Sequence, residues 1–142
     1  MGDEKKLIVY VEDSPSARAM VTEELESHGY QIMTATDAAD LERRILSQDD
    51  LRARVAMFIL DLEMPQMIGT QIGAVMDQLY PEFKEIPFII YSARPEQEVI
   101  QAVDEVISYS GSFSKNYRGY ILKQAGSMEG LVNKVIEVMG KP

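Results

Sequence analysis

Residues 55–65 read Val-Ala-Met-Phe-Ile-Leu-Asp-Leu-Glu-Met-Pro, and this stretch decides the fold. An apolar run that is too short to cross a membrane ends at the carboxylate of Asp61 and is followed by Pro65. A strand that is apolar on both faces is typical of a parallel sheet covered by helices on both sides. Because ligands of such sheets bind beyond the carboxyl ends of the strands, Asp61 is expected at the functional edge. A carboxylate at this point could equally cap the following helix.

Length and charge limit what the chain can be. Its 142 residues, 46% of them hydrophobic, suit one domain, and we expect a single domain over residues 1–142 without an output domain. The formal net charge of -9, with no dense basic cluster, argues against direct nucleic-acid binding. The lack of cysteine excludes disulfides, and no segment resembles a signal peptide or a bilayer span. We therefore expect a cytoplasmic protein without membrane insertion.

Short apolar runs alternate with segments of helical period along the chain. The strands predicted from these runs span about 6–12, 30–35, 55–61, 86–92 and 119–123. Helices are expected over about 15–28, 37–46, 68–79, 95–107 and 127–139, with connections over 48–54 and 108–118. Met20 and Ile100 fall on helix faces that are expected to be buried. The alternation predicts an α/β, flavodoxin-like (βα)5 sandwich, with a doubly wound parallel sheet in the order 2-1-3-4-5.

Acidic residues follow the first and third predicted strands. These strands are neighbours in the order 2-1-3-4-5, so Glu12, Asp13 and Asp61 are expected to converge. Three adjacent carboxylates repel one another unless a proton or a cation compensates, and hard oxygen ligands favour Mg2+ together with phosphate oxygens. Ser92 and Lys123 end the fourth and fifth strands and would add a hydroxyl and an ammonium group. A metal, a lysine and a hydroxyl together suit phosphoryl transfer.

Four segments at these strand ends carry a resemblance to a known family. They are Val11-Glu12-Asp13-Ser14-Pro15, Asp61-Leu62-Glu63-Met64-Pro65 followed by Gly69, Tyr91-Ser92-Ala93, and Tyr120-Ile121-Leu122-Lys123. This set resembles the signature segments of the receiver domains of two-component response regulators, and the match covers nearly the whole chain in order. The resemblance implies a phosphorylation-dependent switch of a two-component phosphorelay.

The resemblance implies an acceptor and a metal site. Asp61 would be the phosphoacceptor, and its partner would be a histidine kinase or a histidine phosphotransfer protein. Asp13 and Asp61 would bind Mg2+ directly, Glu12 through water, and Glu63 through its backbone carbonyl. The chemistry would be self-catalysed phosphotransfer followed by slow autodephosphorylation, rather than action on a separate metabolite.

The resemblance also implies a switch. Lys123 would pair with the phosphoryl oxygens, Ser92 would move to hydrogen-bond the phosphoryl group, and Tyr120 would turn inward. The signal would leave through the face formed by the fourth helix, the fifth strand and the last helix. It would reach an unknown downstream protein, and a homodimer stays open.

Three features depart from the family or vary within it. Gln124 stands where the family usually has a proline in a cis peptide, and a non-proline cis bond costs roughly 2.5–4 kcal/mol, so a trans bond between Lys123 and Gln124 is predicted. The segment 108–118 is longer than usual for the family and is either an inert loop or a partner surface. Glu63 and Arg94 either pair over the acyl phosphate and slow its hydrolysis, or both face solvent.

Other functional classes fit the sequence less well. A receiver-like interaction module that is never phosphorylated would not need the acids, the serine and the lysine that this chain retains. A flavin-binding domain of the same architecture is disfavoured because the acidic loop 13–15 would repel a flavin phosphate. Haloacid-dehalogenase-like phosphatases carry a second aspartate two residues after the nucleophile, where Glu63 stands here.

Overall fold

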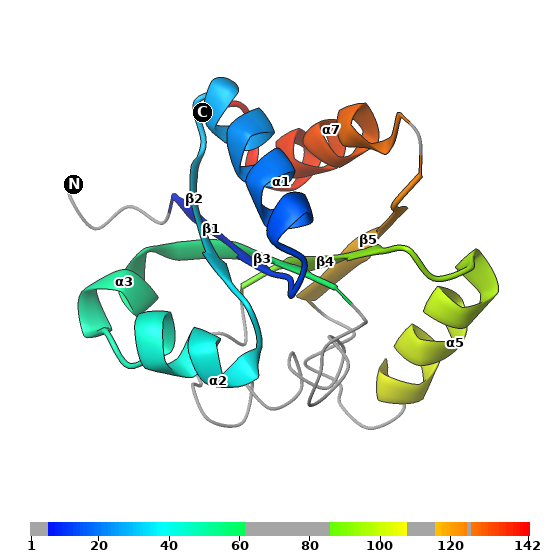
Figure 1. Ribbon diagram of the computed structural model, residues 1–142, viewed down its shortest axis with the longest axis horizontal. Helices are drawn as coiled ribbons and strands as arrows, with labels where there is room; N and C mark the ends of the chain where they lie inside the picture. The colour runs from blue at the N-terminus through cyan, green and yellow to red at the C-terminus, as the bar shows by residue number, and fades with distance from the viewer. Residues whose placement is uncertain (1–5, 62–85, 108–115, 125) are drawn as a thin grey trace.

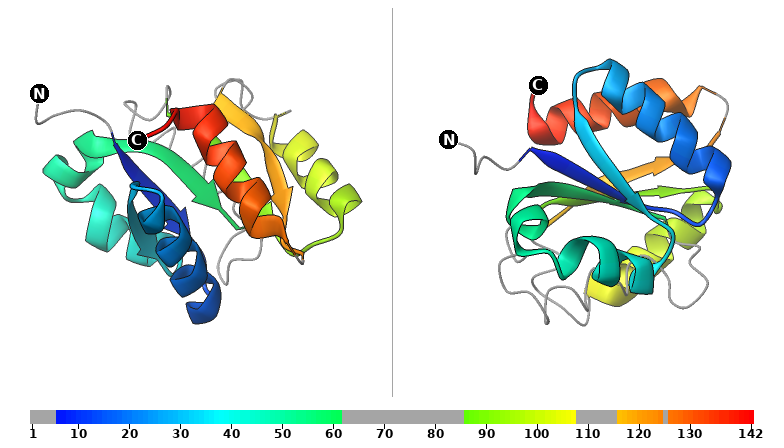
Figure 2. Two further views of the ribbon diagram at one scale, coloured as in Figure 1. Left: turned by 90° about the horizontal axis from the view of Figure 1, so that it is seen from above. Right: turned by 60° about the vertical axis from the view of Figure 1, so that its left-hand side comes forward.

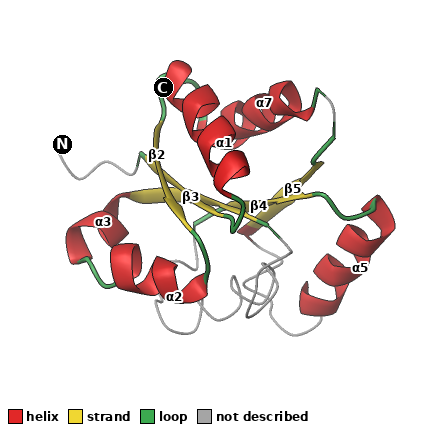
Figure 3. Ribbon diagram, viewed as in Figure 1, coloured by secondary structure: helices red, strands yellow, loops and turns green. Residues whose placement is uncertain are grey.

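Five parallel strands form the central layer of the molecule (Figures 1 and 3). They are β1 (Leu7–Val11), β2 (Gln31–Ala35), β3 (Val55–Leu60), β4 (Phe88–Ser92) and β5 (Tyr117–Leu122). Their order is β2-β1-β3-β4-β5, and all four pairings are parallel, which confirms the predicted flavodoxin-like sheet. The computed structural model describes residues 6–61, 86–107, 116–124 and 126–142.

Helices cover both faces of the sheet (Figure 2). On one face lie α1 (Pro15–Ser27) and α7 (Ser127–Met139). On the other lie α2 (Ala38–Leu41), which continues into the π-helical turn η1 (Glu42–Leu46), then α3 (Asp49–Arg54) and α5 (Glu96–Ile107). The predicted last helix agrees with α7, whereas the helix predicted over 68–79 lies outside the described residues.

The start of α1 shows how the sequence fixes the chain just after the first acidic pair. Ser14 has extended backbone angles, and its hydroxyl accepts a hydrogen bond from the amide of Ala17 at 3.3 Å. Pro15 occupies the first helical position, where its missing amide costs nothing. This cap turns the chain sharply from β1 into α1 and leaves the acids at the end of the strand.

Two predictions about helices were wrong. Residues 48–54 were expected as a connection but contain α3, which has no buried residue and therefore no apolar period to reveal it. Met20 and Ile100 were expected to be buried, but they are 60% and 42% exposed. Each lies beside a fully buried valine, Val21 or Val99, and successive helical residues point about 100° apart, so only one of each pair can face the sheet.

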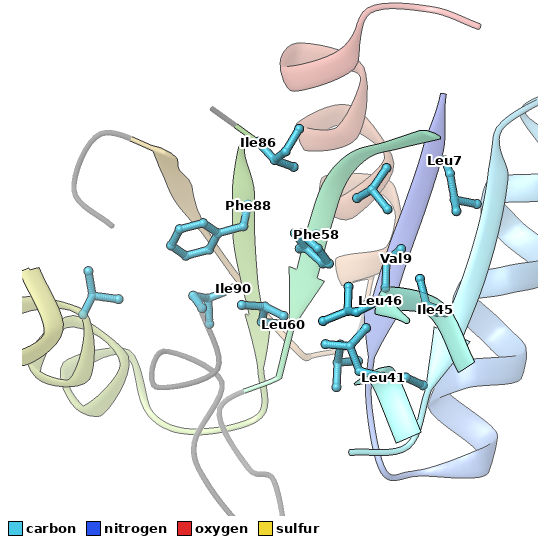
Figure 4. Packing of buried hydrophobic residues seen from close by; sticks show 14 of the residues in the cluster. Leu7, Val9, Leu41, Ile45, Leu46, Phe58, Leu60, Ile86, Phe88 and Ile90 are labelled. Carbon is cyan, nitrogen blue, oxygen red and sulfur yellow. The ribbon is translucent and has the colours of Figure 1, made fainter. Parts of the chain in front are cut away.

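Apolar side chains fill one layer on each side of the sheet because alternate strand residues point to opposite faces. The layer under α2, η1 and α5 includes Leu7, Val9, Leu41, Ile45, Leu46, Phe58, Leu60, Ile86, Phe88 and Ile90 (Figure 4). The layer under α1 and α7 includes Ile8, Tyr10, Val21, Leu25, Tyr30, Met57, Ile59, Ile89, Tyr91, Leu131, Val132 and Val135. All five residues of β1 and of β4 are buried, which explains why these strands read as unbroken apolar runs.

The fifth strand differs from its prediction at its start. It begins at Tyr117 rather than at residue 119, so Arg118, assigned to the loop from the sequence, belongs to the strand. Residues 108–115 of that loop, for which either an inert loop or a partner surface was predicted, lie outside the described residues. No helix in the described part of the chain has the length and apolar character that crossing a bilayer requires.

Candidate functional site

The strands β1, β3, β4 and β5 end at the same edge of the sheet (Figure 1). The amide of Asp61 donates to the carbonyl of Val11 at 3.2 Å, which joins the end of β3 to the end of β1. The amide of Lys123 donates to the carbonyl of Ser92 at 2.7 Å, which joins β5 to β4 in the same way. The polar residues that end or follow these four strands are therefore held near one another.

Three carboxylates meet at this edge. One carboxylate oxygen from each of Glu12, Asp13 and Asp61 lies within 4.8 Å of the other two. Glu12 and Asp61 are only 1% and 4% exposed, whereas Asp13 is exposed to solvent. The structure thus brings together the acids that the strand order predicted, while Glu63 lies outside the described residues.

The ammonium group of Lys123 bridges the two buried acids. Its Nζ atom forms an ion pair with Oε1 of Glu12 and lies 3.3 Å from Oδ2 of Asp61. The same nitrogen lies 5.4 Å from the centroid of the Tyr91 ring, a cation–π distance. The Lys123 side chain is 20% exposed, so its charge is held at the rim of the site rather than in bulk water.

These contacts keep the buried groups charged. Burial alone would raise the pKa of Glu12, but hydrogen bonds from Lys123 and Tyr10 outweigh it and hold that pKa below its usual range. Burial alone would lower the pKa of Lys123, but the hydrogen bond to Glu12 and the charge of Asp61 raise it above its usual range. At neutral pH the site therefore contains an ammonium group facing ionised Glu12.

A tyrosine that the sequence reading missed completes the surroundings of Glu12. The hydroxyl of Tyr10 donates to Oε1 of Glu12 at 2.7 Å, and the amide of Ser14 donates to Oε2 at 3.2 Å. Burial, together with the neighbouring Glu12, raises the pKa of Tyr10, so this hydroxyl keeps its proton. Tyr10 was read only as a member of an apolar strand; the available signal was a tyrosine two residues before an acid, on the same side of the strand.

The ends of β4 and β5 hold the remaining predicted residues. Ser92 is fully buried, and its Oγ atom accepts a hydrogen bond from the amide of Arg94 at 3.1 Å. The hydroxyl of Tyr120 donates to Oε2 of Glu96 on α5 at 2.6 Å, in an exposed hydrogen bond, while its ring packs against the layer under α2, η1 and α5. No peptide bond among the described residues is cis, which confirms the trans bond predicted between Lys123 and Gln124.

The donor set suits a magnesium ion. Its three carboxylates offer hard oxygen ligands whose nearest atoms are close enough to share one cation or its bound water. The ammonium group of Lys123 pairs with Glu12 and Asp61, two of these three acids. A divalent cation would further offset the repulsion among the three carboxylates.

The whole arrangement has a counterpart among known proteins. Residues 8–132 match the model of the response regulator receiver domain. The chain belongs to the response regulator receiver domain family. Receiver domains of two-component systems act in general as phosphorylation-dependent switches, and this receiver has their fold and their acidic strand ends.

The receiver resembles proteins of several bacteria. Over 131 residues, 92% of the chain, it is 25% identical to the CAI-1 autoinducer sensor kinase/phosphatase CqsS of Vibrio cholerae, of which it spans only 17%. The chemotaxis protein CheY4 of Vibrio cholerae has a similar fold, with a TM-score of 0.73 at 23% identity, covering 94% of this chain and 98% of CheY4. The response regulator TrrA of Thermotoga maritima, solved with Mg2+ and BeF, gives a TM-score of 0.68 at 24% identity, covering 94% and 99%.

Proposed function

We propose that Asp61 of this receiver accepts a phosphoryl group from a histidine kinase or a histidine phosphotransfer protein. One observation carries the proposal: the Asp61 carboxylate, buried at the end of β3, lies 3.3 Å from the Lys123 ammonium and close to two further acids. A cation beside a nucleophilic carboxylate offsets the repulsion that an incoming phosphoryl group meets. A cytoplasmic setting is part of the proposal.

The chemical step is a displacement at phosphorus. An oxygen of Asp61 forms a bond to phosphorus while the bond between phosphorus and the donor histidine nitrogen breaks, and the bonding electron pair stays on that nitrogen. The product on this chain is an aspartyl phosphate. Lys123, already beside Asp61, pairs with the phosphoryl oxygens, and the O–H of Ser92 donates to one of them.

The residues that would hold Mg2+ are those that the resemblance to receiver domains implies. Asp13 and Asp61 would bind it directly, Glu12 through water, and Glu63 through its backbone carbonyl. When bound, Mg2+ neutralises the negative charge that builds up on the phosphoryl oxygens. Glu12 and Asp61 are held in place by Lys123, and Glu12 also by Ser14, so little reordering is needed.

The response takes place at β4, β5 and α5. Ser92 moves toward the phosphoryl group, and Tyr120 turns into the space that Ser92 leaves. That turn breaks the hydrogen bond from Tyr120 to Glu96, which in the present structure holds the tyrosine at the surface. The face formed by α5, β5 and α7 then changes shape, and a downstream protein or a second copy of the receiver reads that change.

The proposal is tested by phosphorylation with a small-molecule donor. The protein is incubated with Mg2+ and acetyl phosphate, and its intact mass is followed with time. The parent protein should gain the mass of one phosphoryl group, and chelation of Mg2+ should prevent the gain.

Two variants make the test specific. Asp61→Asn should gain nothing, whereas Asp104→Asn, which removes an exposed carboxylate of α5, should behave like the parent. An unmodified parent would support the alternative of an interaction module that is not phosphorylated. An equal gain on Asp61→Asn would place the acceptor elsewhere.

A further inference from the structure

Tyr10 is a polar residue in the middle of a fully buried strand. It lies between Val9 and Val11 in β1, and none of its surface is exposed. Its ring belongs to the apolar layer under α1 and α7, where a phenylalanine would serve equally well. A buried hydroxyl without a partner costs free energy, so the tyrosine is explained only by what its hydroxyl binds.

That partner is the Glu12 carboxylate. Residues two apart on a strand point to the same face, so the hydroxyl of Tyr10 reaches Oε1 of Glu12 from the apolar layer under α1 and α7, at 2.7 Å. Lys123 reaches the same oxygen from β5, and the amide of Ser14 reaches Oε2 from the loop. Both oxygens of this acid are thereby fixed.

The three donors differ in rigidity. Lys123 has a flexible side chain and is also attracted by Asp61, whose Oδ2 atom lies 3.3 Å from Nζ. The amide of Ser14 belongs to the turn between β1 and α1. Tyr10 is held by close packing on a central strand, so of the two side-chain donors its hydroxyl is the fixed one that sets the direction of the Glu12 carboxylate.

We propose that Tyr10 is a positioning residue of the phosphorylation site, and that its hydroxyl holds the Glu12 carboxylate in the orientation that binds Mg2+. The inference rests on the proposed function of the same site. Hydrogen-bond partners behind a metal ligand fix the orientation of that ligand and so influence metal affinity. Tyr10 acts on Mg2+ only through Glu12 and does not touch the reacting atoms.

Tyr30 provides a matched comparison. It lies in the same apolar layer and is also buried, and its hydroxyl donates at 2.7 Å to the carbonyl of Gly140. That bond joins the start of β2 to the end of α7, and it involves none of the acids of the site. Removing this hydroxyl tests the loss of a buried tyrosine hydrogen bond without any effect on Glu12.

The experiment measures Mg2+ affinity without a phosphodonor. Mg2+ is titrated into the parent, Tyr10→Phe and Tyr30→Phe, and the backbone amide signals of Asp13 and Ser14 are followed by NMR. Tyr10→Phe should bind Mg2+ about tenfold more weakly than the parent, and Tyr30→Phe should bind it within about twofold of the parent. Equal affinities in the parent and Tyr10→Phe, or an equal loss in Tyr30→Phe, would overturn the inference.

A double variant and a rate measurement separate positioning from a general structural effect. In a Glu12→Gln background, adding Tyr10→Phe should change Mg2+ affinity by less than about twofold, because the hydroxyl acts through the carboxylate. At saturating Mg2+, the rate of phosphorylation of Tyr10→Phe by acetyl phosphate should return to within about twofold of the parent rate. A tenfold effect that persists in the Glu12→Gln background would contradict a role through Glu12.

A measurement on the unaltered protein covers the case in which Tyr10→Phe does not fold. With tyrosine labelled at the ring carbon that bears the hydroxyl, the Tyr10 signal should shift when Mg2+ is added, while the Tyr30 signal stays in place. An unchanged Tyr10 signal at saturating Mg2+ would overturn the inference. The Mg2+ measurements test the positioning role of Tyr10 whether or not acetyl phosphate modifies Asp61. A failure of this inference is therefore distinguishable from a failure of the proposed function.

Discussion

The acids that follow β1 and β3 and the Tyr120 side chain of β5 differ in how they are held. At the acidic end, Lys123 connects the two most buried carboxylates, Glu12 and Asp61. Within β5, the hydroxyl of Tyr120 is held against α5 by one exposed hydrogen bond to Glu96. The proposed chemistry thus lies among buried, bridged groups, and the proposed response lies at an exposed hydrogen bond, where motion costs less free energy.

The largest effect is expected from removing the bridging charge. Lys123→Ala leaves Glu12 and Asp61 buried and facing each other, so without Mg2+ the free energy of unfolding should fall by about 3 kcal/mol. Addition of Mg2+ should restore part of the loss because the cation replaces the ammonium charge. Urea unfolding with and without Mg2+ measures both effects.

A lysine of similar exposure that pairs with an exposed acid provides the control for that experiment. Lys134→Ala on α7 removes a pair with the exposed Glu137, at 3.4 Å, and should change stability by less than about 0.5 kcal/mol. If the two alanine variants lost similar stability, the buried acids would be no more tightly held than this pair with an exposed acid.

A third buried carboxylate, outside the site, sharpens the comparison through pH. Asp40 accepts from the amide of Thr36 at 2.9 Å and pairs with Arg43 and Arg44 at 2.9 and 3.1 Å. Burial would raise the pKa of Asp40, but the Thr36 amide and Arg44 outweigh it and hold that pKa below its usual range. The stabilisation is therefore complete above the unfolded pKa of about 3.9 and is lost as the pH falls through the lower folded value.

Asp40→Asn should accordingly destabilise the protein by about 1–2 kcal/mol at pH 7. The difference from the parent should shrink as the pH falls below 4, because the parent carboxylate then becomes protonated. Urea unfolding at both pH values measures this difference. Asp49→Asn, which removes an exposed partner of Arg52, is the control and should show little change at either pH.

A smaller effect is expected at the hydrogen bond between Tyr120 and Glu96. Glu96→Ala removes the acceptor of the Tyr120 hydroxyl and should lower the free energy of unfolding by less than about 1 kcal/mol, because the pair is exposed. It should nevertheless move the ring signals of Tyr120 in NMR spectra toward their positions in the phosphorylated parent. Unchanged ring signals would mean that Glu96 does not hold the tyrosine outward.

The smallest effect concerns the lifetime of the phosphorylated state. If Arg94 pairs with Glu63 over the acyl phosphate, Arg94→Ala should speed dephosphorylation by no more than a few fold, since an exposed pair contributes at most about 1 kcal/mol. Intact mass measured after removal of the phosphodonor gives the rate. An unchanged rate would leave Arg94 without this role.

The sheet could be predicted because its signal is local. Unbroken apolar runs that end on polar residues mark parallel strands buried on both faces, and the strand order then brings Asp13 and Asp61 together. The helix α3 escaped prediction because it buries no residue, so its charges gave no period to read. Met20 lies next to Val21, and composition alone does not say which of two neighbours faces the sheet.

The contacts within the site were harder to predict than its members. The hydrogen bond from Tyr120 to Glu96 joins residues 24 positions apart, on elements whose relative placement no local pattern gives. Tyr10 fits the apolar pattern of its strand, so that pattern gave no sign of the hydrogen bond from its hydroxyl to Glu12 on the same face. Both contacts depend on side-chain directions that become clear only in three dimensions.

The central claim is that Asp61 is the residue that carries the phosphoryl group. The most direct measurement treats the phosphorylated protein with borohydride, which reduces an acyl phosphate to an alcohol, and locates the product by peptide mass spectrometry. The account predicts homoserine at position 61, and none there when Mg2+ is chelated. Homoserine at position 13, 5-hydroxynorvaline at position 12, or no reduced residue at any position would contradict it.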